Sequence, residues 1–102
     1  MSRFLKAVSL ADLPPGAATV VEIEGKEVAL FHQDGAVYAL DNGCPHAAGP
    51  LAEGTVEEGK VECPWHGAQF DLKTGASSSP LAPKGVRAYP VRVNGGDVEI
   101  EI

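Results

Sequence analysis

The sequence is organised around Cys44-Pro45-His46 and Cys63-Pro64-Trp65-His66-Gly67, which together have the pattern C-x-H-x16-C-x-x-H. This stretch contains both cysteines and two of the three histidines of the 102-residue chain. Each Cys-Pro loop offers one thiolate and one imidazole, and two such loops can bring soft and borderline metal ligands to one point. We therefore predict a metal centre whose ligands are Cys44, His46, Cys63 and His66.

The length and composition predict one domain, residues 1–102, with enough apolar residues (44%) for a modest core. No apolar run approaches the roughly 18 residues of a membrane helix, and the first residues lack the apolar stretch of a signal peptide. These features predict a cytoplasmic protein that has no membrane partner. The net charge of −6 also disfavours nucleic acid, so a docking partner is expected to be basic, unless the acidity serves only solubility.

Short alternating segments on both sides of the Cys-Pro loops predict an all-β fold of antiparallel strands. The expected strands are 3–8, 18–23, 27–32, 36–40, 55–57, 60–62, 68–71, 86–93 and 98–102. Asn94-Gly95-Gly96-Asp97 is the clearest hairpin turn, and Ser9-Leu10-Ala11-Asp12 has the form of a capping box that opens one helical turn. We predict a β sandwich or barrel base that carries an inserted, loop-rich, cluster-binding subdomain at about 42–79.

The ligand set alone leaves three interpretations open. The two cysteines could form a disulfide, but a chain without a secretion signal favours metal binding. Two cysteines and two histidines can hold a structural zinc ion, although zinc sites usually have two to four residues between paired ligands and only Pro45 separates Cys44 from His46. Because each loop mixes one thiolate with one imidazole, a [2Fe-2S] cluster with one thiolate-bound iron and one imidazole-bound iron fits better.

The motif C-P-H-x16-C-P-W-H-G resembles the signature of Rieske-type iron–sulfur proteins, and the resemblance continues through Phe70-Asp71-Leu72-Lys73-Thr74-Gly75. It implies antiparallel sheets with a small cluster-binding subdomain and a lid at Pro80. It also implies that Cys44 and Cys63 bind the inner iron of one [2Fe-2S] cluster, while His46 and His66 bind the outer iron.

At four positions the sequence differs from the respiratory branch of this family, so the resemblance is to another branch. That branch carries a disulfide between its loops at the positions of Gly49 and Trp65, and hydroxyl donors at those of Ala68 and Phe70. The sequence is more similar to soluble ferredoxins of ring-hydroxylating dioxygenase systems. The implied role is one-electron transfer from a flavin-containing reductase to a terminal oxygenase, at a low redox potential.

Other functions remain as alternatives. The chain could be the small electron-transfer subunit of a nitrite-reductase-like complex, or a zinc-stabilised or redox-sensing binding module. No nucleophile–base pair, phosphate loop or paired carboxylates are evident in the sequence, so no catalytic residues are predicted and the chain alone is not expected to be an enzyme. For His32 we expect an ordinary packing or surface role, and for Trp65 either core packing or shielding of the cluster.

Overall fold

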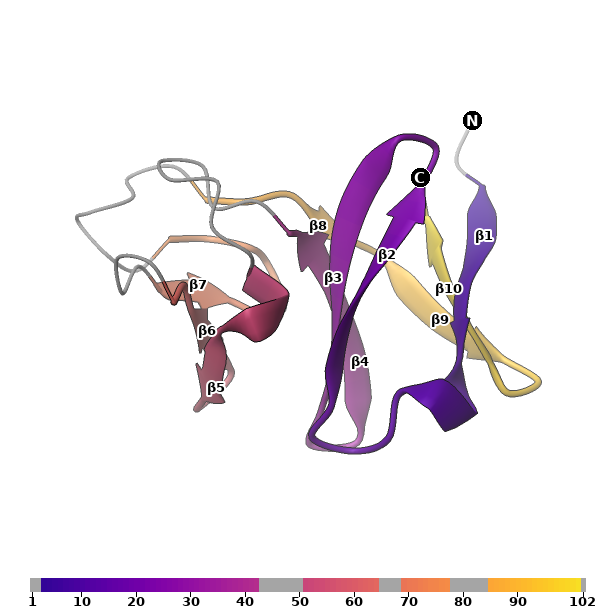
Figure 1. Ribbon diagram of the computed structural model, residues 1–102, viewed down its shortest axis with the longest axis horizontal. Helices are drawn as coiled ribbons and strands as arrows, with labels where there is room; N and C mark the ends of the chain where they lie inside the picture. The colour runs from indigo at the N-terminus through magenta and orange to yellow at the C-terminus, as the bar shows by residue number, and fades with distance from the viewer. Residues whose placement is uncertain (1–2, 43–50, 65–68, 78–84, 102) are drawn as a thin grey trace.

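The computed structural model describes residues 3–42, 51–64, 69–77 and 85–101. The strands in these segments form three antiparallel sheets, which confirms the predicted all-β fold (Figure 1). One sheet joins the two ends of the chain in the order β1 (Phe4–Ser9), β10 (Asp97–Glu101), β9 (Val91–Asn94). The largest has the order β2 (Ala18–Ile23), β3 (Lys26–Gln33), β4 (Ala36–Asp41), β8 (Ala88–Tyr89).

The third sheet is the one that carries the predicted ligand Cys63. It consists of β5 (Thr55–Glu57), β6 (Lys60–Glu62) and β7 (Gln69–Asp71), and it is preceded by the 3-10 turn η2 (Leu51–Glu53). Figure 1 shows this small sheet beside the β2–β3–β4–β8 sheet, on the opposite side from β1, β9 and β10. The small sheet lies within the segment 42–79.

Strand β3 is the central element because both of its faces are covered. Val28 and Leu30 contribute to a core with Leu13, Tyr89 and Ile100, toward the sheet formed by the chain ends. Ala29 and Phe31 point the other way, since successive side chains of a strand alternate between faces, and they join a second core around β6 and β7. The continuous apolar run from Val28 to Phe31 is therefore buried throughout.

Hairpins connect the strands through turns whose two central residues have positive φ. These pairs are Glu24-Gly25, Asp34-Gly35, Glu58-Gly59 and Gly95-Gly96. Positive φ at both positions matches the right-handed twist of the flanking strands, and glycine tolerates it without steric cost. The predicted hairpin at Asn94-Gly95-Gly96-Asp97 is confirmed, with Asn94 opposite Asp97 in the β9–β10 ladder.

Two local predictions were wrong. The expected strand 86–93 is divided at Pro90 into β8 and β9, which pair in different sheets. Proline has no N–H for a ladder, so it suits this passage between sheets. The expected capping box is absent: the 3-10 turn η1 (Leu10–Asp12) follows Ser9, but Ser9 makes no side-chain cap. Instead, the backbone N–H of Leu10 donates to the Gly96 carbonyl at 2.8 Å.

Candidate metal centre

Cys63 is the predicted ligand that the structure describes. It follows β6, its side chain is 1% exposed, and it belongs to the same core as Leu51, Val61 and Phe70. Its burial follows from strand alternation, because Val61 faces the core, Glu62 faces solvent and Cys63 faces the core again. The other predicted ligands, Cys44, His46 and His66, lie outside the described residues, as do Trp65 and the expected lid at Pro80.

The segment that follows Cys63 begins and ends on neighbouring strands of one hairpin. Glu62 lies opposite Gln69 in the β6–β7 ladder, and Val61 lies opposite Phe70. The Gln69 side-chain amide also donates to a Glu62 carboxylate oxygen at 3.4 Å. The base of the predicted loop around His66 is therefore fixed by strand pairing.

The base of segment 43–50, which contains the other predicted ligands, is closed differently. Strand β4 ends at Asp41, and the next residue, Asn42, accepts a 2.8 Å hydrogen bond from the backbone N–H of Leu51. The Asn42 side-chain oxygen accepts a second bond, of 3.0 Å, from the N–H of Ala52. Sequence reasoning missed Asn42, because an asparagine before a Gly- and Pro-rich stretch is an ordinary turn residue.

Backbone contact between glycines closes the third segment, 78–84. The N–H of Val86 donates to the Gly75 carbonyl at 2.8 Å, and Gly75 has φ +76°. A Cβ on Gly85 would overlap the Gly75 carbonyl oxygen, so a side chain would not fit there. Ser77 pairs with Phe70 of β7, which places this base beside the small sheet.

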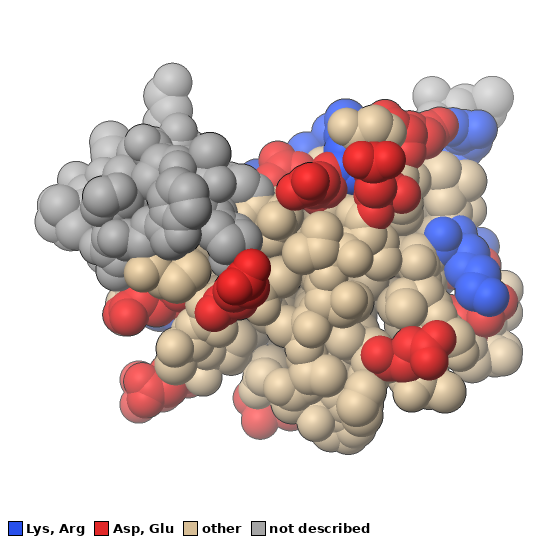
Figure 2. All heavy atoms as spheres, in the orientation of Figure 1, with Lys and Arg blue, Asp and Glu red and all other residues tan. Residues whose placement is uncertain are grey.

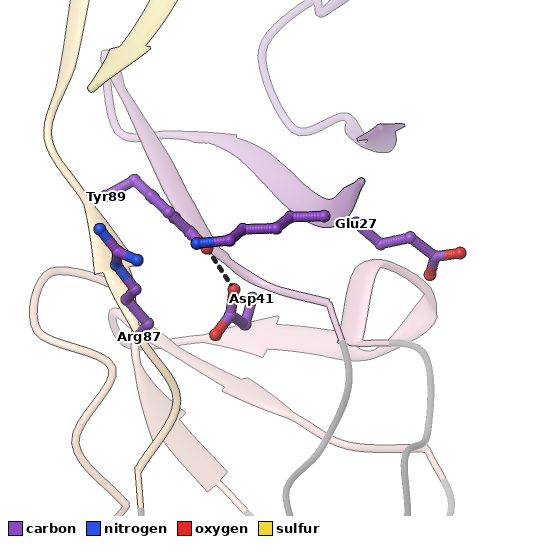
Figure 3. Close-up of a pocket in the computed structure, with 5 residues that line it drawn as sticks. Glu27, Asp41, Arg87 and Tyr89 are labelled. Atoms are coloured by element: carbon purple, nitrogen blue, oxygen red, sulfur yellow. Dashed lines mark hydrogen bonds between the residues drawn. The ribbon is translucent and has the colours of Figure 1, made fainter. Parts of the chain in front are cut away.

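A polar pocket of about 410 Å³ lies between the start of β3, the end of β4 and the segment that enters β8 (Figure 3). It is lined by Lys26, Glu27, Asp41, Arg87 and Tyr89. The Tyr89 hydroxyl donates to an Asp41 carboxylate oxygen at 2.5 Å, and the Arg87 guanidinium lies 4.7 Å from the Tyr89 ring centre. Burial, together with the hydrogen bond to Asp41, raises the pKa of Tyr89 from 10.0 to about 12. Tyr89 is thus a neutral donor that ties β8 to the last residue of β4.

His32 has the ordinary packing role expected from the sequence. Its Nδ1 lies 2.7 Å from the Leu13 carbonyl oxygen. A carbonyl can only accept, so Nδ1 carries the proton in this hydrogen bond. Leu13 is fully buried, and the contact helps to hold the segment between η1 and β2 against β3.

The surface charge is uneven around the small sheet. Figure 2 shows acidic side chains beside this sheet and over the neighbouring strands, whereas few basic side chains are visible near it on this face. The segment 42–79 contains Glu53, Glu57, Glu58, Glu62 and Asp71 against Lys60 and Lys73. This segment therefore carries an excess of negative charge.

Comparison with known proteins decides the family, since residues 3–90 match the model of the Rieske [2Fe-2S] domain. The chain belongs to the Rieske [2Fe-2S] family. The ferredoxin component of the naphthalene 1,2-dioxygenase system of Pseudomonas aeruginosa is 36% identical over 100 residues, covering 98% of this chain and 96% of that protein. The resemblance predicted from the motif is thereby confirmed, and the cofactor is a Rieske-type [2Fe-2S] cluster.

Solved structures agree with this membership. The ferredoxin of carbazole 1,9a-dioxygenase from Nocardioides aromaticivorans has a TM-score of 0.89 at 34% identity, covering 95% of each chain. A chain from the complex of reduced oxygenase and oxidised ferredoxin in carbazole 1,9a-dioxygenase has a TM-score of 0.87 at 30% identity, covering 95% of this chain and 91% of that one. A putative NADH-dependent nitrite reductase small subunit from Mycobacterium tuberculosis has a TM-score of 0.90 at 26% identity, covering 100% and 96%.

The surroundings of Cys63, the predicted ligand within the described residues, fit this cofactor. Cys63 is a buried thiol at the end of a strand, a setting in which a soft metal ligand is held rigidly and away from water. Like the ferredoxin components to which it is similar, the chain is an electron carrier and not a catalyst by itself. No helix in the segments described is long and apolar enough to span a membrane.

Proposed function

We propose that this Rieske ferredoxin accepts single electrons from a flavin-containing reductase and delivers them to the terminal oxygenase of a ring-hydroxylating system. The observation that carries this proposal is the family match over residues 3–90, together with ferredoxin relatives that align over nearly the whole chain. The similarity to a chain of the carbazole oxygenase–ferredoxin complex supports an oxygenase as the acceptor. The reductase is proposed because an electron carrier needs a donor.

The proposed cluster ligands are Cys44 and Cys63 on one iron and His46 and His66 on the other. The segment 42–79 is the proposed cluster-binding subdomain of a single Rieske domain, 1–102. The position of Cys63, buried beside the base of the β6–β7 loop, supports this assignment. Two neutral imidazoles in place of two thiolates make the site less negative, so the cluster is easier to reduce than one held by four cysteines.

Docking is proposed to use the negative charge of the subdomain. The acidic residues around β5 and β6 would attract a basic surface that surrounds the electron entry or exit site of a partner. Such charges act mainly on the rate of association and on partner choice. Neither nucleic acid nor a membrane surface is a proposed partner, since both are negatively charged.

Metal and sulfide analysis tests the cluster. Anaerobically purified protein is expected to contain two irons and two acid-labile sulfides per chain, as a [2Fe-2S] cluster requires. His46→Ala and His66→Ala should lose the cluster or hold it unstably, and His32→Ala is the matched control because His32 contacts the Leu13 carbonyl instead. One zinc per chain without sulfide would contradict the proposal and favour the zinc-stabilised module.

Electron transfer tests the role. The reduced protein should be reoxidised by a ring-hydroxylating oxygenase with its substrate and oxygen, and the oxidised protein should be reduced by a flavin-containing reductase with a nicotinamide. A protein that contains the cluster but exchanges electrons with neither class would refute the carrier role.

The second candidate is a small electron-transfer subunit of a nitrite-reductase-like complex, favoured by the similarity to the putative nitrite reductase small subunit. Affinity purification of the tagged chain from its own host separates the two candidates. A free carrier should elute largely alone at moderate salt, whereas a permanent subunit should retain a large reductase chain at a constant ratio.

The proposed location is the cytoplasm, where reductases that use nicotinamide cofactors have their substrates. Fractionation of the native host provides the test. The chain is expected with cytoplasmic marker enzymes, and recovery with periplasmic or membrane markers would contradict this location.

A further inference from the structure

Asn42 joins three separate parts of the structure at the base of segment 43–50. Its backbone N–H donates to the Glu27 carbonyl at 3.1 Å, and its own carbonyl accepts from Leu51 at 2.8 Å. Its side-chain amide donates to Glu27 Oε1 at 3.3 Å, while its side-chain oxygen accepts from Ala52 N at 3.0 Å. Asn42 therefore connects the start of β3, the end of β4 and the turn η2.

The carboxamide suits this position because it offers a donor and an acceptor on one short side chain. Asn42 is 6% exposed, so its carboxamide makes these hydrogen bonds largely out of contact with water, where the loss of a partner is costly. An aspartate would retain the acceptor for Ala52 but would place a second carboxylate beside Glu27. Leu51, fully buried in the core that contains Cys63, anchors the far end of the segment.

Among the residues that the structure describes, Asn42 is the buried polar one, and the other two segment bases are closed by different contacts. Strand pairing between Glu62 and Gln69 closes one base, and the backbone contact between Gly75 and Val86 closes the other. At the base of segment 43–50, β4 ends at Asp41 and the chain resumes in the 3-10 turn η2, so neither side of this base is a strand. The Asn42 side chain therefore supplies hydrogen bonds that a neighbouring strand would otherwise provide. The geometry of this base thus responds to one side chain.

We infer that Asn42 is a positioning residue for the [2Fe-2S] cluster. It fixes Leu51 and Ala52 against the end of β4, and so holds together the two ends of the loop that contains the proposed ligands Cys44 and His46. This inference rests on the proposed assignment of those residues as ligands. Asn42 is not proposed to bind the cluster itself. It keeps the ends of the loop together, and this slows the loss of the cluster.

The first test compares Asn42→Ala with Asn94→Ala, the same chemical change in the exposed β9–β10 turn. Cluster loss is followed by visible absorbance in the presence of an iron chelator. Loss of buried hydrogen bonds predicts a half-life about fivefold shorter for Asn42→Ala and an unchanged one for Asn94→Ala. The reduction potential and the electron paramagnetic resonance spectrum of the reduced cluster should also shift in Asn42→Ala alone.

A reversed hydrogen-bonding pair keeps the inference testable if Asn42→Ala does not fold. Asn42→Asp should shorten the half-life, because the introduced carboxylate and that of Glu27 would both be acceptors. Adding Glu27→Gln supplies an amide donor that faces the new carboxylate. The formal net charge of the double variant stays at −6, since one substitution adds a negative charge and the other removes one. The double variant should recover the half-life, potential and spectrum toward those of the wild type.

The outcomes separate this inference from the proposed function. A wild-type protein that contains no iron and sulfide would refute the ligand assignment itself. A wild-type protein with a cluster, combined with an Asn42→Ala variant of unchanged half-life, potential and spectrum, would overturn the positioning role alone. Equal impairment of Asn42→Asp and the double variant would overturn it as well.

Discussion

A Cβ on Gly54 would overlap the backbone oxygen of Glu62, because the two backbones are in direct contact. The turn after segment 43–50 therefore packs its backbone on the end of β6, next to Cys63. The N–H of Gly54 also donates to the Leu51 carbonyl at 2.9 Å, which keeps the turn tight. The absence of a side chain at Gly54 thus sets how closely the bases of two proposed ligand loops approach.

Gly54→Ala is therefore expected to destabilise the protein. Because backbone lies on both sides of the contact, relief requires a shift of η2 or β6, at a cost of about 1–3 kcal/mol in the free energy of unfolding. Denaturant unfolding measures this change. The control is Glu53→Ala, which places the same side chain at an exposed position one residue earlier. Equal stabilities for the two variants would show that the backbones separate at no cost.

Tyr89 makes a contribution to stability that depends on pH. Its pKa is raised to about 12 in the folded protein by burial and by the hydrogen bond to Asp41, against 10.0 for an ordinary tyrosine. The contribution is fully present below pH 10 and is lost as the pH rises through about 12, because the unfolded chain gives up this proton first.

Tyr89→Phe tests this pH dependence. Subtracting its ultraviolet titration from that of the wild type should give a tyrosine titrating near pH 12, and stability should fall less steeply above pH 10 in the variant. Tyr38→Phe, which removes the other tyrosine but leaves the hydrogen bond between Tyr89 and Asp41 in place, is the matched control for the loss of a hydroxyl. A difference titration centred near pH 10 would show that burial and the hydrogen bond to Asp41 do not raise the pKa of Tyr89.

Electron delivery to the oxygenase should slow as salt rises. The chain has a net charge of −6, and salt would screen the proposed attraction between its acidic segment 42–79 and a basic partner surface. Stopped-flow mixing of the reduced protein with the oxygenase measures the association rate, which should fall between low and about 0.5 M salt. A constant rate would indicate an apolar docking surface and an acidity that serves solubility.

The redox potential should lie near the low end of the Rieske range, at roughly −150 mV and not +300 mV. Phe70 is fully buried in the core that contains Cys63 and has no hydroxyl to donate toward sulfur. Ala68, which lies outside the described residues, also lacks a donor. Phe70→Tyr and Ala68→Ser should each raise the potential, because hydrogen bonds to sulfur stabilise the more negative reduced state.

Potentiometric titration of the wild type and both variants measures this effect. Phe70→Leu is the control for altered packing without a hydroxyl. A wild-type value well above zero, or hydroxyl variants that shift no more than Phe70→Leu, would refute the hydroxyl explanation and leave solvent exposure as the cause.

The sequence by itself determined the strands and the chemical character of the site. Alternation of polar and apolar residues, as in β10, and turn pairs such as Asp34-Gly35 act over a few residues, so their effect can be predicted locally. The Cys-Pro loops pointed to the Rieske family for the same reason, since the ligands of each loop lie within four residues of one another and the two loops are only sixteen residues apart. The division at Pro90 was open to local reasoning but was missed.

Only the tertiary structure decided how the loop bases are held. The hydrogen bond from Asn42 reaches Glu27 across 15 residues, and Tyr89 reaches Asp41 across 48. Gly54 and Gly85 look like ordinary loop glycines, although backbone from another segment occupies the space that a side chain would need. Such contacts depend on which strands become neighbours, and that pairing follows from burying both faces of β3 in two separate cores.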